Sequence, residues 1–146
     1  MKKIFLALLL VTMTAAAYAQ DAPKTKEEKI KALYESVDQD VEKMTANLDL
    51  ADWQVFKVDS TLTHDIQAMV DEMEKMSATG ITNLNMYTAV QDKWAESTYL
   101  SYKTFLTEEQ WAKYLKSGAA RAKKARDKRA AKAVRDQEKL KARLSK

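Results

Sequence analysis

The chain has 146 residues and a net charge of +4 at neutral pH, with no cysteine, two glycines and one proline. The lack of cysteine excludes a disulfide framework, a thiolate metal site and a lipid-modified cysteine. Because glycine and proline are so scarce, and no long strand-like alternation is present, the sequence predicts an all-α protein.

The N-terminal segment has the pattern of a cleavable export signal. Residues 1–3 are Met-Lys-Lys, an apolar run covers residues 4–11, and residues 17–19 are Ala-Tyr-Ala, a typical cleavage site. We expect residues 1–19 to be a signal peptide, and Gln20 to begin a mature protein in the periplasm. Once the signal is removed, we expect no transmembrane segment, because no other apolar run approaches the ~20 residues that span a bilayer.

The first predicted helix begins at Thr25, because Glu28 three residues later completes a capping box. The apolar residues of this helix alternate at spacings of four and three, which predicts a heptad seam buried against another helix, as in a coiled coil. These residues are Ile30, Tyr34, Val37, Val41, Met44 and Leu48.

Three further helices are predicted in the body, which we place at residues 20–117. The second follows Asp49 and ends at Gly80, since glycine is the usual left-handed residue after a helix. A third begins near Thr82 or Asn83 and a fourth at Thr107. Helices of this length joined by short turns predict elongated antiparallel hairpins.

Three methionines, Met69, Met73 and Met76, recur on one face of the second helix. Three interpretations remain open for this stripe. It is a core seam, a deformable apolar surface for varied unfolded clients, or a soft thioether site for Cu(I). His64 is the only histidine, so we expect no zinc site. No cofactor is predicted.

The fourth helix begins with a well-formed capping sequence, in which Leu106 and Thr107 are followed by Gln110. The Thr107 hydroxyl is expected to accept from the backbone N–H of Gln110, while the Gln110 side chain accepts from the N–H of Thr107. Glu108 and Glu109 stand between Thr107 and Gln110 and place negative charge at the positive, N-terminal end of the helix dipole.

A partial copy of this motif, Leu50 to Gln54, stands at the start of the second helix. Ala51 occupies the place of the threonine, so the hydroxyl cap is missing. We therefore expect Asp49 or Asp52 to cap this helix instead.

Residues 118–146 form a tail in which Ala, Lys and Arg dominate. We expect a long basic helix with little apolar surface to bury. Residues 20–111 carry nine Lys against eighteen Asp or Glu, a net charge of −9, whereas residues 112–146 carry fourteen Lys or Arg against three acids, a net charge of +11.

Three roles remain open for this basic tail. It folds back on the acidic body of its own or a second subunit, it binds an anionic surface such as lipopolysaccharide, anionic lipid or an acidic polypeptide, or it keeps the chain soluble. Nucleic acid is not an expected partner, because the protein is exported and the tail has no aromatic residue to stack on a base. The candidate anion-binding residues are Lys123, Lys124, Arg126, Lys128 and Arg129.

The sequence gives no basis for catalysis, and we predict that the protein is not an enzyme. With one histidine and no cysteine, there are few ways to activate a nucleophile. No glycine-rich phosphate loop is present. No pair of carboxylates stands out in an apolar setting that would raise a pKa.

The paired motifs, Leu50 to Gln54 and Leu106-Thr107 to Gln110, lie behind an export signal in a helical chain and resemble those of the Spy/CpxP family of Gram-negative periplasmic proteins. The resemblance covers about half of the mature chain, from near Leu48 to Leu115. It implies an ATP-independent chaperone or stress-response protein of the cell envelope. Members of this family are helical hairpins that pair into a curved homodimer and hold partly unfolded clients on the concave side, and some instead damp a membrane sensor kinase.

This chain departs from the family in two respects besides Ala51. The family's client face is typically basic, whereas this body is acidic, so a cationic client surface would have to come from the tail. The zinc-resistance proteins that look like the family depend on histidines that this chain lacks. The alternative function is that of a non-catalytic interaction protein whose basic C-terminal arm binds an anionic envelope component.

Overall fold

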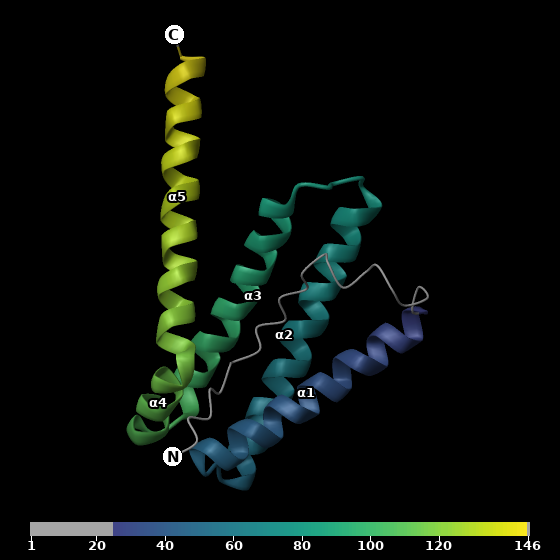
Figure 1. Ribbon diagram of the computed structural model, residues 1–146, viewed down its shortest axis with the longest axis vertical. Coiled ribbons are helices and arrows are strands. Elements are labelled where there is room, and N and C mark those ends of the chain that lie inside the picture. Colours follow the sequence, from purple (N-terminus) through teal and green to yellow (C-terminus); the bar gives the residue numbers. More distant parts are fainter. Residues whose placement is uncertain (1–24, 146) are drawn as a thin grey trace, which may run out of the picture.

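The computed structural model describes residues 25–145, and the predicted signal peptide lies outside this range. The described chain is all-α and ends in a long helix, which confirms the fold class predicted from the sequence. Figure 1 shows α1, α2 and α3 as successive hairpins, with α5 starting beside the lower end of α3, diverging from it and extending past it. The helices are α1 (Lys26–Leu48), α2 (Asp52–Ala78), α3 (Leu84–Phe105), α4 (Glu108–Tyr114) and α5 (Ala120–Leu144).

The first helix begins as its sequence predicts. The N–H of Glu28 donates to the Thr25 hydroxyl over 3.2 Å, and the N–H of Thr25 donates to the Glu28 carboxylate over 2.8 Å. In the seam of α1, Val37, Val41 and Leu48 are buried and Met44 is partly buried, but Tyr34 is exposed. The expectation that Tyr34 belongs to the buried seam is therefore wrong, because α1 diverges from α2 toward its N-terminus (Figure 1).

Two turns depend on glycine. Gly80 has a φ of 75°, and directly after it the N–H of Ile81 donates to the carbonyl of Met76 over 3.1 Å, which ends α2 in a Schellman motif. Gly118 has a φ of 121° within the wide turn Leu115–Ala119 that joins α4 to α5. A side chain at either glycine would meet no neighbouring atom, so it is the positive φ that favours glycine at both positions.

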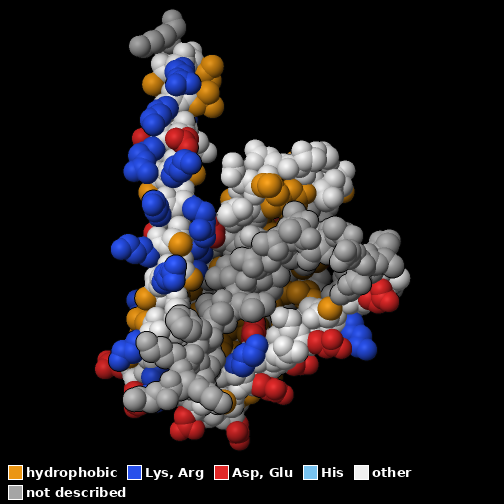
Figure 2. All heavy atoms as spheres, viewed as in Figure 1, with side chains coloured by type: hydrophobic (Ala, Val, Ile, Leu, Met, Phe, Trp, Pro, Cys, Tyr) orange, Lys and Arg blue, Asp and Glu red, His pale blue; other side chains and the backbone are white. Residues whose placement is uncertain are grey.

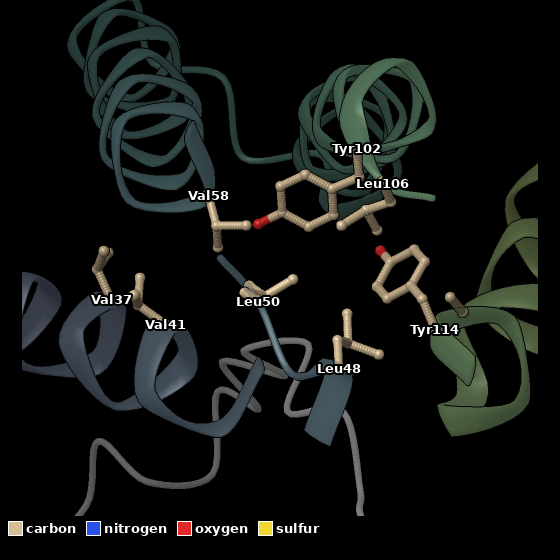
Figure 3. Close-up of a cluster of buried hydrophobic side chains, with 9 residues drawn as sticks. Val37, Val41, Leu48, Leu50, Val58, Tyr102, Leu106 and Tyr114 are labelled. Carbon is tan, nitrogen blue, oxygen red and sulfur yellow. The ribbon is translucent and has the colours of Figure 1, made fainter. Parts of the chain in front are cut away.

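The core lies where α1, α2, α3 and α4 meet (Figure 3). Val58 of α2 is fully buried at its centre, and the Tyr102 hydroxyl of α3 points toward it. Aromatic rings of α3 and α4 pack edge to face around Tyr102, with centroids 5.5 Å apart for Tyr102 and Tyr114. The buried hydrophobic residues of this cluster are Val37, Val41, Leu48, Leu50, Val58, Tyr102, Leu106, Tyr114 and Ala119.

The last helix is attached to the body only at its start. Ala119 and Arg126 are buried, whereas every side chain from Asp127 to Ser145 is exposed. Figure 2 shows Lys and Arg side chains along the projecting part of this helix. Among the described helices, none has an apolar stretch long enough to cross a membrane.

Candidate functional site

The two Leu-x-x-x-Gln motifs meet through their glutamines. The Gln54 amide Nε2 donates to Oε1 of Gln110 over 2.7 Å, and the Gln110 Nε2 donates to Oε1 of Gln54 over 2.9 Å. Each side-chain oxygen also accepts the backbone N–H of its own N-cap residue, Ala51 or Thr107, over 3.0 Å. We call this pair of amides, Gln54 and Gln110, the glutamine clasp.

The remaining N–H of each amide crosses to the other motif. Gln54 donates to the carbonyl of Phe105 over 3.1 Å, and Gln110 donates to the carbonyl of Asp49 over 3.3 Å. Phe105 lies five residues before Gln110, and Asp49 lies five residues before Gln54. The two halves of the clasp are therefore nearly equivalent. Both amides thus use two donors and two acceptor sites. The clasp joins the start of α2 to the start of α4.

The two motifs differ at their caps. Ala51 is the N-cap of α2 and makes no side-chain capping bond. The expectation that Asp49 or Asp52 supplies this cap is therefore wrong. Asp49 instead ends α1 in a left-handed conformation with a φ of 52°, and Asp52 is already the first residue of the helix.

Exchanging the cap residues should change stability in opposite directions. The Thr107 hydroxyl accepts the N–H of Gln110 over 3.2 Å, so Thr107→Ala should lower the free energy of unfolding by about 1 kcal/mol. Ala51 has nearly the same extended backbone, with φ −69° and ψ 155° against −65° and 163° for Thr107. Ala51→Thr should therefore be neutral or stabilising by up to about 1 kcal/mol. Urea unfolding measures both, and a loss for Ala51→Thr larger than that for Thr107→Ala would contradict the equivalence of the motifs.

The methionine stripe lies outside the central core. Met69, Met73 and Met76 are partly buried along the distal half of α2, whereas Met44 packs against the core cluster. Within residues 25–145, no three His, Asp or Glu side chains converge in a way that could hold a metal ion.

The predicted anion-binding residues divide into two groups. Arg126 is buried, and its Nε and Nη2 donate to one oxygen of Glu96 over 3.2 and 3.1 Å. Arg129 binds both oxygens of Asp92 over 2.6 Å each. Lys123 lies 3.4 Å from Glu96 and also binds Asp127, its neighbour on α5.

The other two residues, Lys124 and Lys128, are exposed and form no ion pair within the described range. The start of the tail thus folds back on the acidic body. The Arg126 guanidinium and the Lys123 ammonium also lie 5.6 and 5.9 Å from the centre of the Tyr99 ring, within reach of a cation–π interaction. What remains for an external anion is the outward side of α5.

An exposed aromatic pair adjoins the clasp and was not singled out from the sequence. Trp53 is 56% exposed and Phe56 is 68% exposed, both near the start of α2. The Trp53 ring packs against the Phe105 ring with centroids 6.4 Å apart. The sequence signal that could have identified them is a pair of aromatic residues, three positions apart, that do not belong to the apolar seam of α2.

Asp65 is a buried carboxylate that sequence reasoning also missed. Its side chain is 6% exposed. It accepts the Thr98 hydroxyl over 2.9 Å, and its other oxygen lies 2.9 Å from Nδ1 of His64. These contacts satisfy both oxygens and link α2 to α3, which is a structural role.

A nearby carboxylate, Glu72, joins the same two helices. One Glu72 oxygen binds Nζ of Lys93 over 2.7 Å and Nε1 of Trp94 over 2.8 Å. These hydrogen bonds lower the pKa of Glu72 below its ordinary value.

No protein-family model, curated protein or solved structure matches this chain. The features from which a function can be inferred are therefore the clasp, the exposed aromatic pair and the projecting helix.

Proposed function

We propose that this protein is a periplasmic, ATP-independent chaperone or envelope-stress protein that binds partly unfolded clients without catalysis. The observation that carries the proposal is the exposed pair Trp53 and Phe56. Large apolar side chains that gather on a surface commonly mark a binding site. Aromatic rings also provide much contact area with few torsions to immobilise.

The clasp supports this assignment because it helps to hold Trp53 in place. Gln54 directly follows Trp53, and its amide binds the carbonyl of Phe105, whose ring packs against Trp53. A surface held in place by buried hydrogen bonds loses less conformational freedom when it binds a client. The paired motifs that resemble those of Spy and CpxP would then serve as the support of the client surface.

The net negative charge of α2, the helix that carries the aromatic pair, suggests which clients would bind. Helix α2 carries six acidic residues and two lysines, and Asp52 is exposed beside Trp53. Unfolded segments that combine apolar and basic side chains are therefore the expected clients. This differs from a client surface made of basic residues in the tail.

The test is suppression of client aggregation, followed by light scattering with reduced insulin as the client. Trp53→Ser combined with Phe56→Ser should remove most of the suppression. The matched control is Leu84→Ser with Met86→Ser, two exposed apolar residues at the far end of the hairpin, and it should retain suppression. Full suppression by the aromatic variant would overturn the proposal.

A second candidate function follows from the exposed lysines of α5. In this alternative, the protein binds an anionic envelope component without catalysis, and Lys124 and Lys128 are among the residues that contact it. Binding to lipopolysaccharide or phosphatidylglycerol vesicles should then fall steeply with salt, because exposed charges are screened beyond roughly 8–10 Å near physiological ionic strength.

Truncation after Arg129 separates the two candidates, because it keeps the ion pairs of Arg126 and Arg129. A chaperone that acts through Trp53 and Phe56 should keep its suppression of aggregation after this truncation. An anion-binding arm should lose much of its vesicle binding, because the truncation removes most of the exposed basic residues of α5 and leaves Lys124 and Lys128. The removed residues are Lys132, Arg135, Lys139, Lys141 and Arg143. Salt-insensitive vesicle binding that survives truncation would contradict the second candidate.

A further inference from the structure

The face of α5 that packs on α3 continues beyond the point where the two helices separate. Ala119 and Arg126 are buried on this face. Further along α5, the residues on the same face follow the four-three spacing of a heptad seam. They are Ala130, Ala133, Gln137, Leu140 and Leu144, and all are exposed.

The opposite side of the projecting segment is basic. Lys128, Lys132, Arg135 and Lys139 lie on it at helical spacing. Figure 2 shows Lys and Arg along α5 and hydrophobic side chains near its end, on the side toward the rest of the molecule. The segment is thus a two-sided helix whose apolar face continues an established interface but has no partner of its own in the described chain.

We infer that this segment, which we call the arm (residues 130–144), pairs with the arm of a second copy of the chain as an antiparallel two-helix coiled coil. In that arrangement Ala133 faces Leu144 of the second copy, so a small side chain meets a large one. Gln137 faces Leu140 of the second copy. At the edge of the seam, Asp136 comes beside Arg143 of the second copy, and the symmetry repeats this charge pair.

The charges of the bodies favour the antiparallel direction. A parallel pair of arms would place two acidic bodies side by side, whereas the antiparallel pair keeps them at opposite ends. The basic residues Lys132, Arg135 and Lys139 point away from the seam in either case. The overlap, residues 133–144, is about 18 Å long at 1.5 Å per residue, so the dimer is expected to be weak and to depend on concentration.

The polarity of the face favours a second copy over a lipid surface. Gln137 lies in the middle of the face, between Ala133 and Leu140. In a bilayer an amide at this place would lose its hydrogen bonds with water. In a coiled coil, one polar residue at a seam position is a common device that sets the register.

Sedimentation velocity of the mature chain over a range of concentrations tests the inference. The wild-type protein should show a dimer fraction that grows with concentration, and Leu140→Asp with Leu144→Asp should abolish it. The matched control, Ala131→Asp with Ala142→Asp, adds the same charge to the opposite side of α5 and should still dimerise. A wild-type protein that stays monomeric at its solubility limit, or a dimer that survives the leucine substitutions, would overturn the inference.

Disulfide trapping tests the register, because the chain has no native cysteine. An oxidised mixture of the single variants Gln137→Cys and Leu140→Cys should give mainly the mixed disulfide. Efficient self-linking of Gln137→Cys in place of the mixed product would overturn the antiparallel register. If the leucine variant instead loses binding to phosphatidylglycerol vesicles while the wild-type protein stays monomeric, the face binds membrane and the inference fails.

Discussion

Replacing Gln54 with alanine should lower the free energy of unfolding by about 3 kcal/mol. The Gln54 side chain is 2% exposed and makes four hydrogen bonds, with the N–H of Ala51, the carbonyl of Phe105 and both polar atoms of Gln110. Alanine would leave these partners without a donor or acceptor in a space that water fills poorly. Buried groups left unpaired cost about 1–3 kcal/mol each, and partial access of water to Gln110 reduces the total.

Urea unfolding followed by circular dichroism measures this loss. Gln67→Ala is the matched control, since Gln67 lies on the same helix and binds Asp71 at the surface; its effect should stay within about 0.5 kcal/mol. A double-mutant cycle with Gln110→Ala should give a coupling energy of about 1–2 kcal/mol. A Gln54→Ala loss as small as that of Gln67→Ala would show that the clasp does not stabilise the body.

Gln54→Glu tests the donors of the clasp separately from its shape. The substituted carboxylate would place an oxygen where the Nε2 now faces the carbonyl of Phe105 and Oε1 of Gln110. At neutral pH this variant should lose at least as much stability as Gln54→Ala, because a charge is buried against two acceptors. Stability near that of the wild type would contradict the donor assignment.

The protein should lose stability steeply between pH 10 and 12. Burial raises the pKa of Tyr114 to about 12 and raises the pKa of Tyr102 well above its ordinary value. In this range a tyrosine ionises in the unfolded chain but keeps its proton when it is buried in the folded protein. The stability of the folded state is therefore complete below pH 10 and falls as the pH rises toward the pKa of the folded state. Each tyrosine contributes about 1.4 kcal/mol per pH unit, so Tyr114 alone accounts for about 2.7 kcal/mol by pH 12.

Lysine side chains also lose their charge in this pH range, in every variant. Phenylalanine substitutions therefore isolate the contribution of the two tyrosines. Tyr102→Phe combined with Tyr114→Phe should flatten the fall in unfolding free energy, whereas Tyr34→Phe, at an exposed position, should not. Tyr102→Phe should also stabilise the protein by about 1 kcal/mol at neutral pH, because its buried hydroxyl has no hydrogen-bond partner among the described residues. An unchanged slope in the double variant would show that the two tyrosines are not the cause.

Features that depend on residues close together in the chain could be predicted from the sequence alone. The capping boxes at Thr25 and Thr107 and the helix end at Gly80 each involve partners within five residues, and all three form as predicted. The apolar spacing of α1 likewise predicted the burial of Val37, Val41 and Leu48, although it wrongly included Tyr34. Helix caps and helix faces are local properties, so the pattern alone was sufficient for them.

Which polar groups meet depends on the packing of the helices and could not be predicted from the sequence. Gln54 and Gln110 are 56 residues apart, and their caps predicted two similar helix starts but not a direct contact. In the same way, the charge pattern left open whether the tail folds back on the body. The packing of α5 on α3 brings Arg126 and Arg129 to carboxylates of α3. These contacts depend on how the helices cross and where they diverge. That geometry comes from the fit of whole faces, because the helical pattern of each segment is compatible with several arrangements.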